Sequence, residues 1–254
     1  MRKVSLKSGL YYDSTFALLG IILFILGNQK MNYKSVIFDL DGTLLNTLED
    51  IADSLNRVLR KMGLETHSTD AYRYFVGSGA EEMVARVLPP EKHHKELIAE
   101  YVEAFQAEYR RNWNLKTRPY DGVSELLRAL SDRGVRMSVL SNKPQEFTVL
   151  SIRQYFPGYD FAVVLGQRKG IPLKPDPIGA LEIARRLDIP TGEFIFVGDT
   201  GVDMETAVRA GMFPLGVSWG FRPEEELMES GAIKVVRHPD DILSFMNSSG
   251  VFKE

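Results

Sequence analysis

From residue 34 onward, short apolar runs alternate with longer amphipathic stretches. The apolar runs cover residues 35–38, 136–140, 161–165, 194–197 and 213–217. Each run ends abruptly in polar residues or glycine, and stretches with helical periodicity separate the runs. Nearly continuous apolar strands between helices are typical of a parallel sheet that helices cover on both faces. The pattern therefore predicts an α/β, Rossmann-like fold.

A different pattern fills the interval between the first two runs. Apolar residues first recur there at helical spacing, at Ile51, Leu55, Val58, Leu59 and Met62. Gly63 then ends this helix in the way a C-terminal cap does, and a longer helix is predicted from about Glu91 to Asn112. We expect residues 48–117 to form an inserted α-helical cap, and residues 31–47 and 118–254 to form the catalytic core. The alternative is that the longer helix belongs to the core.

The first thirty residues do not fit this pattern. Residues 16–27 form an apolar run of 12 residues after several basic ones, whereas a membrane span needs about 20. A secretory signal has an apolar region of about this length, but no small-x-small cleavage motif follows it. We expect a misassigned start, with translation beginning at Met31 and a cytoplasmic protein. The alternatives for residues 1–30 are a membrane-associating segment, the only case in which we expect a membrane partner, and a helix packed on the domain.

The composition excludes several kinds of chemistry. The formal net charge is -3 and the basic residues are scattered, so no patch is expected to bind nucleic acid. The chain has no cysteine, which excludes disulfides, thiolate nucleophiles and cysteine-ligated zinc. The lack of cysteine also fits a reducing compartment.

Acidic residues follow two of the predicted strands. Asp39 and Asp41 end the first strand, and Asp199 and Asp203 follow the strand at 194–197. In parallel sheets the ligand lies beyond the carboxyl ends of the strands, so these acids are candidates for one shared site. Carboxylates so close together repel each other and are costly to desolvate, which favours a hard divalent cation such as Mg²⁺. A helix N-cap would explain one of these acids, but not all four.

Four segments together resemble the signature motifs of the haloacid dehalogenase (HAD) superfamily. They are residues 39–43 (DLDGT), Ser141, Lys174 within KPDP, and residues 198–203 (GDTGVD). The resemblance covers the chain from Met31 onward, and the helical insertion is similar to the C1-type cap of this superfamily. Residues 75–79 (FVGSG) and 216–221 (GVSWGF) are most similar to the phosphoglycolate phosphatase-like group.

The resemblance implies a magnesium-dependent phosphatase that acts on a small phosphorylated metabolite through an aspartyl-phosphate. Asp39 would be the nucleophile and Asp41 the general acid and base. Lys174 would neutralise charge on Asp39 and on the phosphoryl group. The implied Mg²⁺ ligands are the Asp39 side chain, the backbone carbonyl of Asp41, and Asp199. Asp203 is expected to orient these ligands rather than bind the ion.

Substrate contacts are expected from the core and from the cap. The implied phosphate-binding residues of the core are Thr43, Ser141 and Asn142. In the cap, the turn Gly77, Ser78 and Gly79 is suited to bring backbone amides close to a ligand such as a carboxylate. The alternative for this turn is a flexible connection between helices.

The core motifs leave other activities open. A pyrophosphatase or a β-phosphoglucomutase-type phosphomutase would carry the same motifs. Asn46 occupies a position where many phosphoglycolate phosphatase-like chains carry Asp and pyrophosphatase relatives can carry Asn. A binding module without turnover is a further alternative on the same fold, although the complete set of acids with Lys174 argues against it. Dehalogenases usually lack an equivalent of Asp41, so its presence favours phosphate chemistry.

Overall fold

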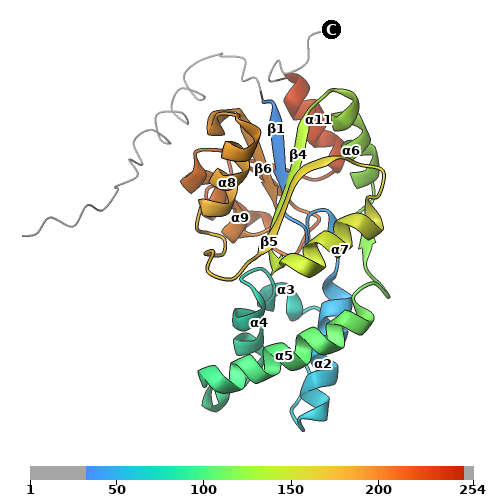
Figure 1. Cartoon of the computed structure of the whole chain (residues 1–254), viewed down its shortest axis with the longest axis vertical. Helices are drawn as coiled ribbons and strands as arrows, with labels where there is room; N and C mark the ends of the chain where they lie inside the picture. Colours follow the sequence, from blue (N-terminus) through green and yellow to red (C-terminus); the bar gives the residue numbers. More distant parts are fainter. Residues whose placement is uncertain (1–32, 249–254) are drawn as a thin grey trace, which may run out of the picture.

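A computed structural model describes residues 33–248 and shows a sheet domain joined to a group of helices (Figure 1). The expectations for residues 1–30 lie outside the described residues. Within the described range, no helix combines the length and apolarity needed to cross a membrane.

The sheet has six strands in the order β5-β4-β1-β6-β7-β8, and all neighbours are parallel. The strands are β1 (Ser35–Phe38), β4 (Arg136–Pro144), β5 (Phe161–Gln167), β6 (Phe194–Gly198), β7 (Phe213–Val217) and β8 (Lys234–Val236). The predicted α/β fold is thus confirmed. Because β1 lies in the middle of the sheet, the residues that follow it stand at the centre of the edge formed by the carboxyl ends of the strands.

Helices cover both faces of the sheet, and β1 shows why. Val36 and Phe38 pack on one face with α6 (Val123–Asp132), α7 (Gln145–Tyr155) and α11 (Pro239–Ser248). Ile37 points to the other face and packs with α8 (Ile178–Leu187) and α9 (Gly201–Ala210). Successive side chains of a strand point to opposite faces, so a strand buried on both sides has to be apolar throughout. A short helix, α10 (Glu224–Glu229), connects β7 to β8.

The helical insertion lies between β2 (Leu45–Asn46) and β3 (Arg118–Pro119), which pair antiparallel where the chain leaves and re-enters the sheet domain. It consists of α2 (Leu48–Lys61), α3 (Tyr72–Phe75), α4 (Ala80–Val87), a 3₁₀ turn (Pro90–Lys92) and α5 (Lys95–Asn112). These helices form an apolar cluster of their own, which Phe147 of α7 and Phe221 complete from the sheet domain. The exact division of the chain into domains stays a prediction.

The structure corrects three details of the sequence analysis. Strand β8 follows the run at 213–217, which was expected to be the last strand. The long helix begins at Lys95 rather than at Glu91, because the 3₁₀ turn that contains Glu91 precedes it. Strand β4 continues beyond Leu140 to Pro144, where it still pairs with Gln167 of β5 across an irregular register.

Candidate active site

The candidate site lies at the carboxyl ends of the central strands. Asp39 follows β1 directly, and its backbone amide donates a hydrogen bond of 2.9 Å to the Val197 carbonyl of β6. Asp199 follows β6 directly, and Asp203 lies in the first turn of α9. The parallel pairing of β1 with β6 therefore brings together acids that are far apart in the sequence.

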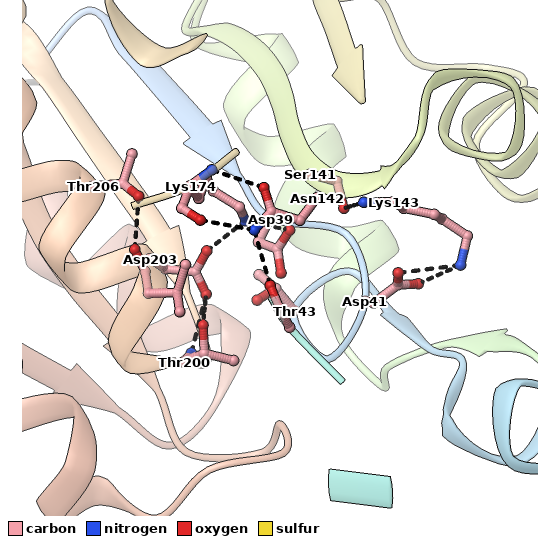
Figure 2. Close-up of polar contacts among 12 residues, drawn as sticks. Asp39, Asp41, Thr43, Ser141, Asn142, Lys143, Lys174, Thr200, Asp203 and Thr206 are labelled. Atoms are coloured by element: carbon pink, nitrogen blue, oxygen red, sulfur yellow. Dashed lines mark hydrogen bonds and ion pairs between the residues drawn. The ribbon is translucent and has the colours of Figure 1, made fainter. Parts of the chain in front are cut away.

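Three acids form what we call the carboxylate cluster: Asp39, Asp199 and Asp203. One carboxylate oxygen from each lies within 4.8 Å of the others, and all three side chains are buried. The Lys174 ammonium donates to Asp39 Oδ1 at 2.8 Å and to Asp203 Oδ1 at 2.6 Å (Figure 2). In the described part of the chain, Lys174 is the one cation that pairs with these carboxylates. One ammonium therefore faces three carboxylates, and negative charge is in excess.

Burial and the neighbouring charges shift the pKa values of Asp39, Asp199 and Lys174. Burial raises the pKa of Asp39 to about 7, and the neighbouring acids add to this effect while Lys174 opposes it. Burial also raises the pKa of Asp199 well above its usual range, with further contributions from Asp203 and Asp39. Burial by itself would lower the pKa of Lys174, but the attraction of Asp203 and Asp39 outweighs it and the pKa is raised. The ammonium therefore stays charged, whereas the carboxylates lack a sufficient counter-charge.

Hydrogen bonds fix two members of the cluster. Asp203 Oδ2 accepts from the Thr200 amide at 3.1 Å and from the Thr200 hydroxyl at 2.7 Å, which closes a capping box at the start of α9. Asp199 accepts from the Thr43 hydroxyl at 2.9 Å and from the Phe221 amide at 2.8 Å. Thr43 was expected to bind phosphate, and in the structure its hydroxyl donates a hydrogen bond to Asp199. Its role toward a phosphoryl group stays a prediction.

Two glycines allow the backbone to approach Asp199 closely. A Cβ atom at Gly42 would lie 2.2 Å from Asp199 Oδ2, and one at Gly220 would lie 2.2 Å from Asp199 Cβ. Gly42 also has a φ of +93°, which residues with side chains rarely adopt. The glycine of the DLDGT segment is thus required by a close contact as well as by its backbone conformation.

A cavity of about 60 Å³ extends from Asp39 to the helical insertion, which is room for roughly four or five water molecules. Residues of the insertion form an apolar wall, namely Ile51, Val76, Ala80, Met83 and Phe105. The opposite side carries Asp39, Asp41, Ser141, Asn142 and Lys143. A molecule bound here would touch the acids with one end and the apolar wall with the other.

Asp41 lies at the side of this cavity and is paired with Lys143, a residue that the sequence analysis did not consider. The Lys143 ammonium donates to Asp41 Oδ1 at 2.9 Å, to Asp41 Oδ2 at 3.1 Å, and to the Tyr109 hydroxyl of α5 at 2.9 Å. Burial would lower the pKa of Lys143, but Asp41 and Tyr109 outweigh this effect and raise it. The Lys143 side chain is therefore a buried ammonium that links β4, the end of β1 and the helical insertion.

Ser141 and Asn142 precede Lys143 on β4, and both line the cavity. The Ser141 hydroxyl accepts a long hydrogen bond of 3.3 Å from the Lys143 amide. The Asn142 side chain accepts from the Lys174 amide at 2.9 Å and donates to the Lys174 carbonyl at 3.0 Å. It also donates to the Gly77 carbonyl of the insertion at 3.0 Å. Asn142 therefore fixes the backbone of Lys174 and joins it to the turn at residues 77–79.

Arginines tie the turn at residues 77–79 to its surroundings. Gly77 and Gly79 line the cavity, whereas the Ser78 hydroxyl accepts from Arg86 at 3.2 Å. Arg222, from the segment after β7, donates to the Val76 carbonyl at 3.0 Å. The turn is thus held from both the insertion and the sheet domain.

The comparisons with known proteins agree with this geometry. Residues 36–217 match the family of haloacid dehalogenase-like hydrolases. The chain therefore belongs to this family.

Its relatives point to one group within the family. The chain is 33% identical over 190 residues to a phosphoglycolate phosphatase of Aquifex aeolicus, covering 74% of this chain and 86% of the relative. It is 31% identical over 207 residues to a phosphoglycolate phosphatase of Pseudomonas fluorescens, covering 80% and 76%. The crystal structure of a "predicted phosphoglycolate phosphatase" from Haemophilus somnus matches with a TM-score of 0.78 at 26% identity, covering 84% of this chain and 98% of that one. The chain is thus a phosphoglycolate phosphatase-like member of the family.

Proposed function

We propose that this protein is a Mg²⁺-dependent phosphatase that hydrolyses a small phosphomonoester similar to phosphoglycolate. The observation that carries the proposal is the position of Asp39. Its carboxylate lies next to the cavity, is held by Lys174 at 2.8 Å, and belongs to a cluster of three buried acids. The relatives named as phosphoglycolate phosphatases support the substrate class.

The carboxylate cluster fits a divalent cation. Its oxygens are the donor type that Mg²⁺ prefers. Burial, with a smaller contribution from the neighbouring acids, raises the pKa values of Asp39 and Asp199, and a bound cation would counter both effects. Both oxygens of Asp203 already accept from Lys174 or Thr200. Both oxygens of Asp199 also accept, but from the neutral donors Thr43 and Phe221, whereas Lys174 already offsets the charge of Asp203. We therefore assign the ligand oxygens to Asp39, Asp199 and the Asp41 carbonyl, as the motif resemblance implies, with Asp203 orienting the cluster. When bound, Mg²⁺ would offset negative charge on the phosphoryl group and on the acids.

The proposed reaction has two steps. In the first, an Asp39 oxygen attacks phosphorus, the bond from phosphorus to the leaving oxygen breaks, and Asp41 gives that oxygen a proton. In the second, water attacks the aspartyl-phosphate, Asp41 takes a proton from the water, and phosphate and Asp39 are released. Lys174 keeps Asp39 in place and offsets charge throughout. The Ser141 hydroxyl and the backbone amide of Asn142 would hold phosphoryl oxygens. The side-chain amide of Asn142 is not assigned this role, because it is bonded to Lys174 and Gly77.

The test is phosphate release from a substrate panel with Mg²⁺ and with a chelator. The panel contains phosphoglycolate, pyrophosphate, sugar phosphates, nucleotides and p-nitrophenyl phosphate. We expect Mg²⁺-dependent release, with phosphoglycolate among the best substrates. Preferential cleavage of pyrophosphate, or isomerisation of a sugar phosphate without release, would replace the proposal with one of those activities. No release with any divalent metal would favour a binding module.

A further inference from the structure

The pair formed by Lys143 and Asp41 has a geometry that the proposed reaction does not explain. Lys143 is only 7% exposed, and its three N–H groups are directed to both oxygens of Asp41 and to the Tyr109 hydroxyl. In Figure 2 the Asp41 carboxylate lies beside the Lys143 ammonium, on the opposite side of Asp39 from Asp203. Both oxygens of the proposed general acid thus accept from a cation that lies apart from the carboxylate cluster.

Asp41 has to leave this pair, at least in part, to reach a leaving oxygen on a phosphoryl group at Asp39. A buried ammonium that loses its anionic partner without a replacement is costly, because the charge is then neither solvated nor paired. The Tyr109 hydroxyl stays within reach of Lys143 but carries no charge, since burial raises its pKa to about 12. Lys143 therefore needs a second anion when Asp41 turns toward the substrate.

The residues that line the cavity indicate that the substrate itself would supply this anion. Lys143 is the only cationic side chain among the described residues that line the cavity. Apart from Gln106 and Tyr109, the insertion contributes apolar side chains or glycine backbone to the lining. A substrate with its phosphoryl group at Asp39 would thus bring its leaving group between an apolar wall and one ammonium. A carboxylate on that leaving group fits the ammonium, whereas an uncharged group gains nothing from it.

We propose that Lys143 is the specificity residue of this site: it binds an anionic group, a carboxylate by size and charge, on the leaving-group side of the substrate. In doing so it exchanges Asp41 for the substrate and frees Asp41 to reach the leaving oxygen. The proposal rests on the proposed phosphatase function and deepens it. Because Tyr109 belongs to α5, the same ammonium also links carboxylate binding to the position of the helical insertion.

The test compares two substrates that differ only in this group. Phosphoglycolate and ethyl phosphate have the same phosphoester, and a methyl group in the second replaces the carboxylate of the first. We expect Lys143→Met to lower kcat/KM for phosphoglycolate roughly 10- to 100-fold, the range for hydrogen bonds to charged groups. The value for ethyl phosphate should fall less, because that substrate lacks the group in question. The ratio of the two kcat/KM values is the readout, since any effect of the variant through Asp41 is common to both substrates. Lys143→Arg should retain the preference, and the exposed Lys169→Met is the matched control.

A binding measurement keeps the proposal open to refutation if Lys143→Met does not fold. Asp41→Asn leaves Lys143 without an anionic partner, so it should bind phosphoglycolate more tightly, by roughly tenfold, than the equally inactive Asp39→Asn, in which Asp41 still occupies Lys143. The affinities of the two variants for ethyl phosphate should differ much less. Calorimetric titration of both inactive variants in the presence of Mg²⁺ measures these affinities. A positioning role for Lys143 through Asp41 alone would not produce this selective gain.

Each other outcome counts against the proposal. Equal losses for both substrates in Lys143→Met would show that Lys143 acts only through Asp41. A carboxylate preference that survives in that variant would assign recognition to the turn at residues 77–79. Wild-type protein that hydrolyses p-nitrophenyl phosphate with Mg²⁺ but does not distinguish the two substrates would overturn this inference and leave the phosphatase proposal intact. Absence of any Mg²⁺-dependent turnover would overturn both.

Discussion

The two ends of the cavity differ in how they hold charge. At the core end, three carboxylates lie close together, one ammonium pairs with two of them, and each side chain is fixed by residues of the sheet domain. At the end next to the insertion, one carboxylate and one ammonium are paired with each other, and their surroundings are mostly apolar. The core end has an excess of negative charge, whereas the charges at the other end are balanced.

This difference indicates a division of labour. A site with excess negative charge and rigid partners suits a divalent cation, and through that cation a phosphoryl group. The cation and the phosphoryl group are the same for every substrate. A balanced pair beside an apolar wall suits a part of the substrate that differs from one enzyme to another. Substitutions at the core end should therefore reduce catalysis for every substrate, whereas those at the other end should change which substrate is preferred.

The largest effect is expected at Asp39. Asp39→Asn removes the attacking oxygen while keeping the size of the side chain, so turnover of every substrate should fall by roughly 10⁴- to 10⁶-fold. The fold should persist, because the variant also removes one of the buried negative charges. Phosphate release and circular dichroism measure the two properties. Full activity in a folded variant would end the assignment of Asp39 as the nucleophile.

Lys174→Met should give the next largest effect. The variant leaves Asp39 and Asp203 without their cation, so kcat should fall by about 10²- to 10³-fold for phosphoglycolate and ethyl phosphate alike. The free energy of unfolding should also fall by roughly 3–5 kcal/mol, the usual cost of removing one partner from a buried ion pair. Chemical denaturation measures the loss, with the exposed Lys169→Met as control. A loss of activity confined to phosphoglycolate would contradict the division of labour.

Removal of the metal should make stability depend on pH. The pKa of Asp39 is about 7 in the folded protein and 3.8 for the unperturbed side chain. Between these values the folded state binds more protons than the unfolded state, so stability in a chelator should fall as the pH rises from about 4 to 7. Mg²⁺ should offset this loss, and its stabilising effect should grow with pH to roughly 5–10 °C in Tm at saturation. Thermal melts from pH 5 to pH 8 with Mg²⁺ or chelator provide the check, and an effect of Mg²⁺ that is independent of pH would contradict it.

The core end could be predicted from the sequence, for a physical reason. A central strand buried on both faces has to be apolar, so the acids at its end stand out as residues that the fold alone does not require. Asp39 and Asp199 are such residues, and parallel pairing of β1 with β6 leaves them little choice of position. Gly42 and Thr43 belong to the same segment, but their contacts with Asp199 became visible only with the structure.

The other end could not be predicted in the same way. Lys143 follows Ser141 and Asn142 in a stretch that the sequence analysis took as the polar end of a strand, and nothing in it indicates a partner at Asp41. Tyr109 follows the helical spacing of the apolar residues before it, so the sequence does not distinguish it from a residue that only packs in the core. Their contact depends on how the helical insertion packs on the sheet domain, and this packing joins elements that no local pattern relates. Arg222 is missed for the same reason.

Arg222 provides the smallest and most selective prediction. It is 9% exposed, donates to the Val76 carbonyl at 3.0 Å, and lies over the Tyr74 ring at 5.2 Å. Arg222→Met should loosen the turn at residues 77–79 and raise KM by roughly tenfold, the value of one charged hydrogen bond, with a much smaller change in kcat.

The affinity for Mg²⁺ separates this effect from damage to the core end. Arg222 is adjacent to Phe221, whose amide donates to Asp199. If Arg222 acts only on the insertion, Arg222→Met should bind Mg²⁺ as wild type does, and the exposed Arg153→Met should behave as wild type in every assay. If Mg²⁺ affinity falls while KM rises, the segment after β7 transmits the position of the insertion to Asp199. The two ends of the cavity would then be coupled, and the division of labour would hold only while the insertion is docked.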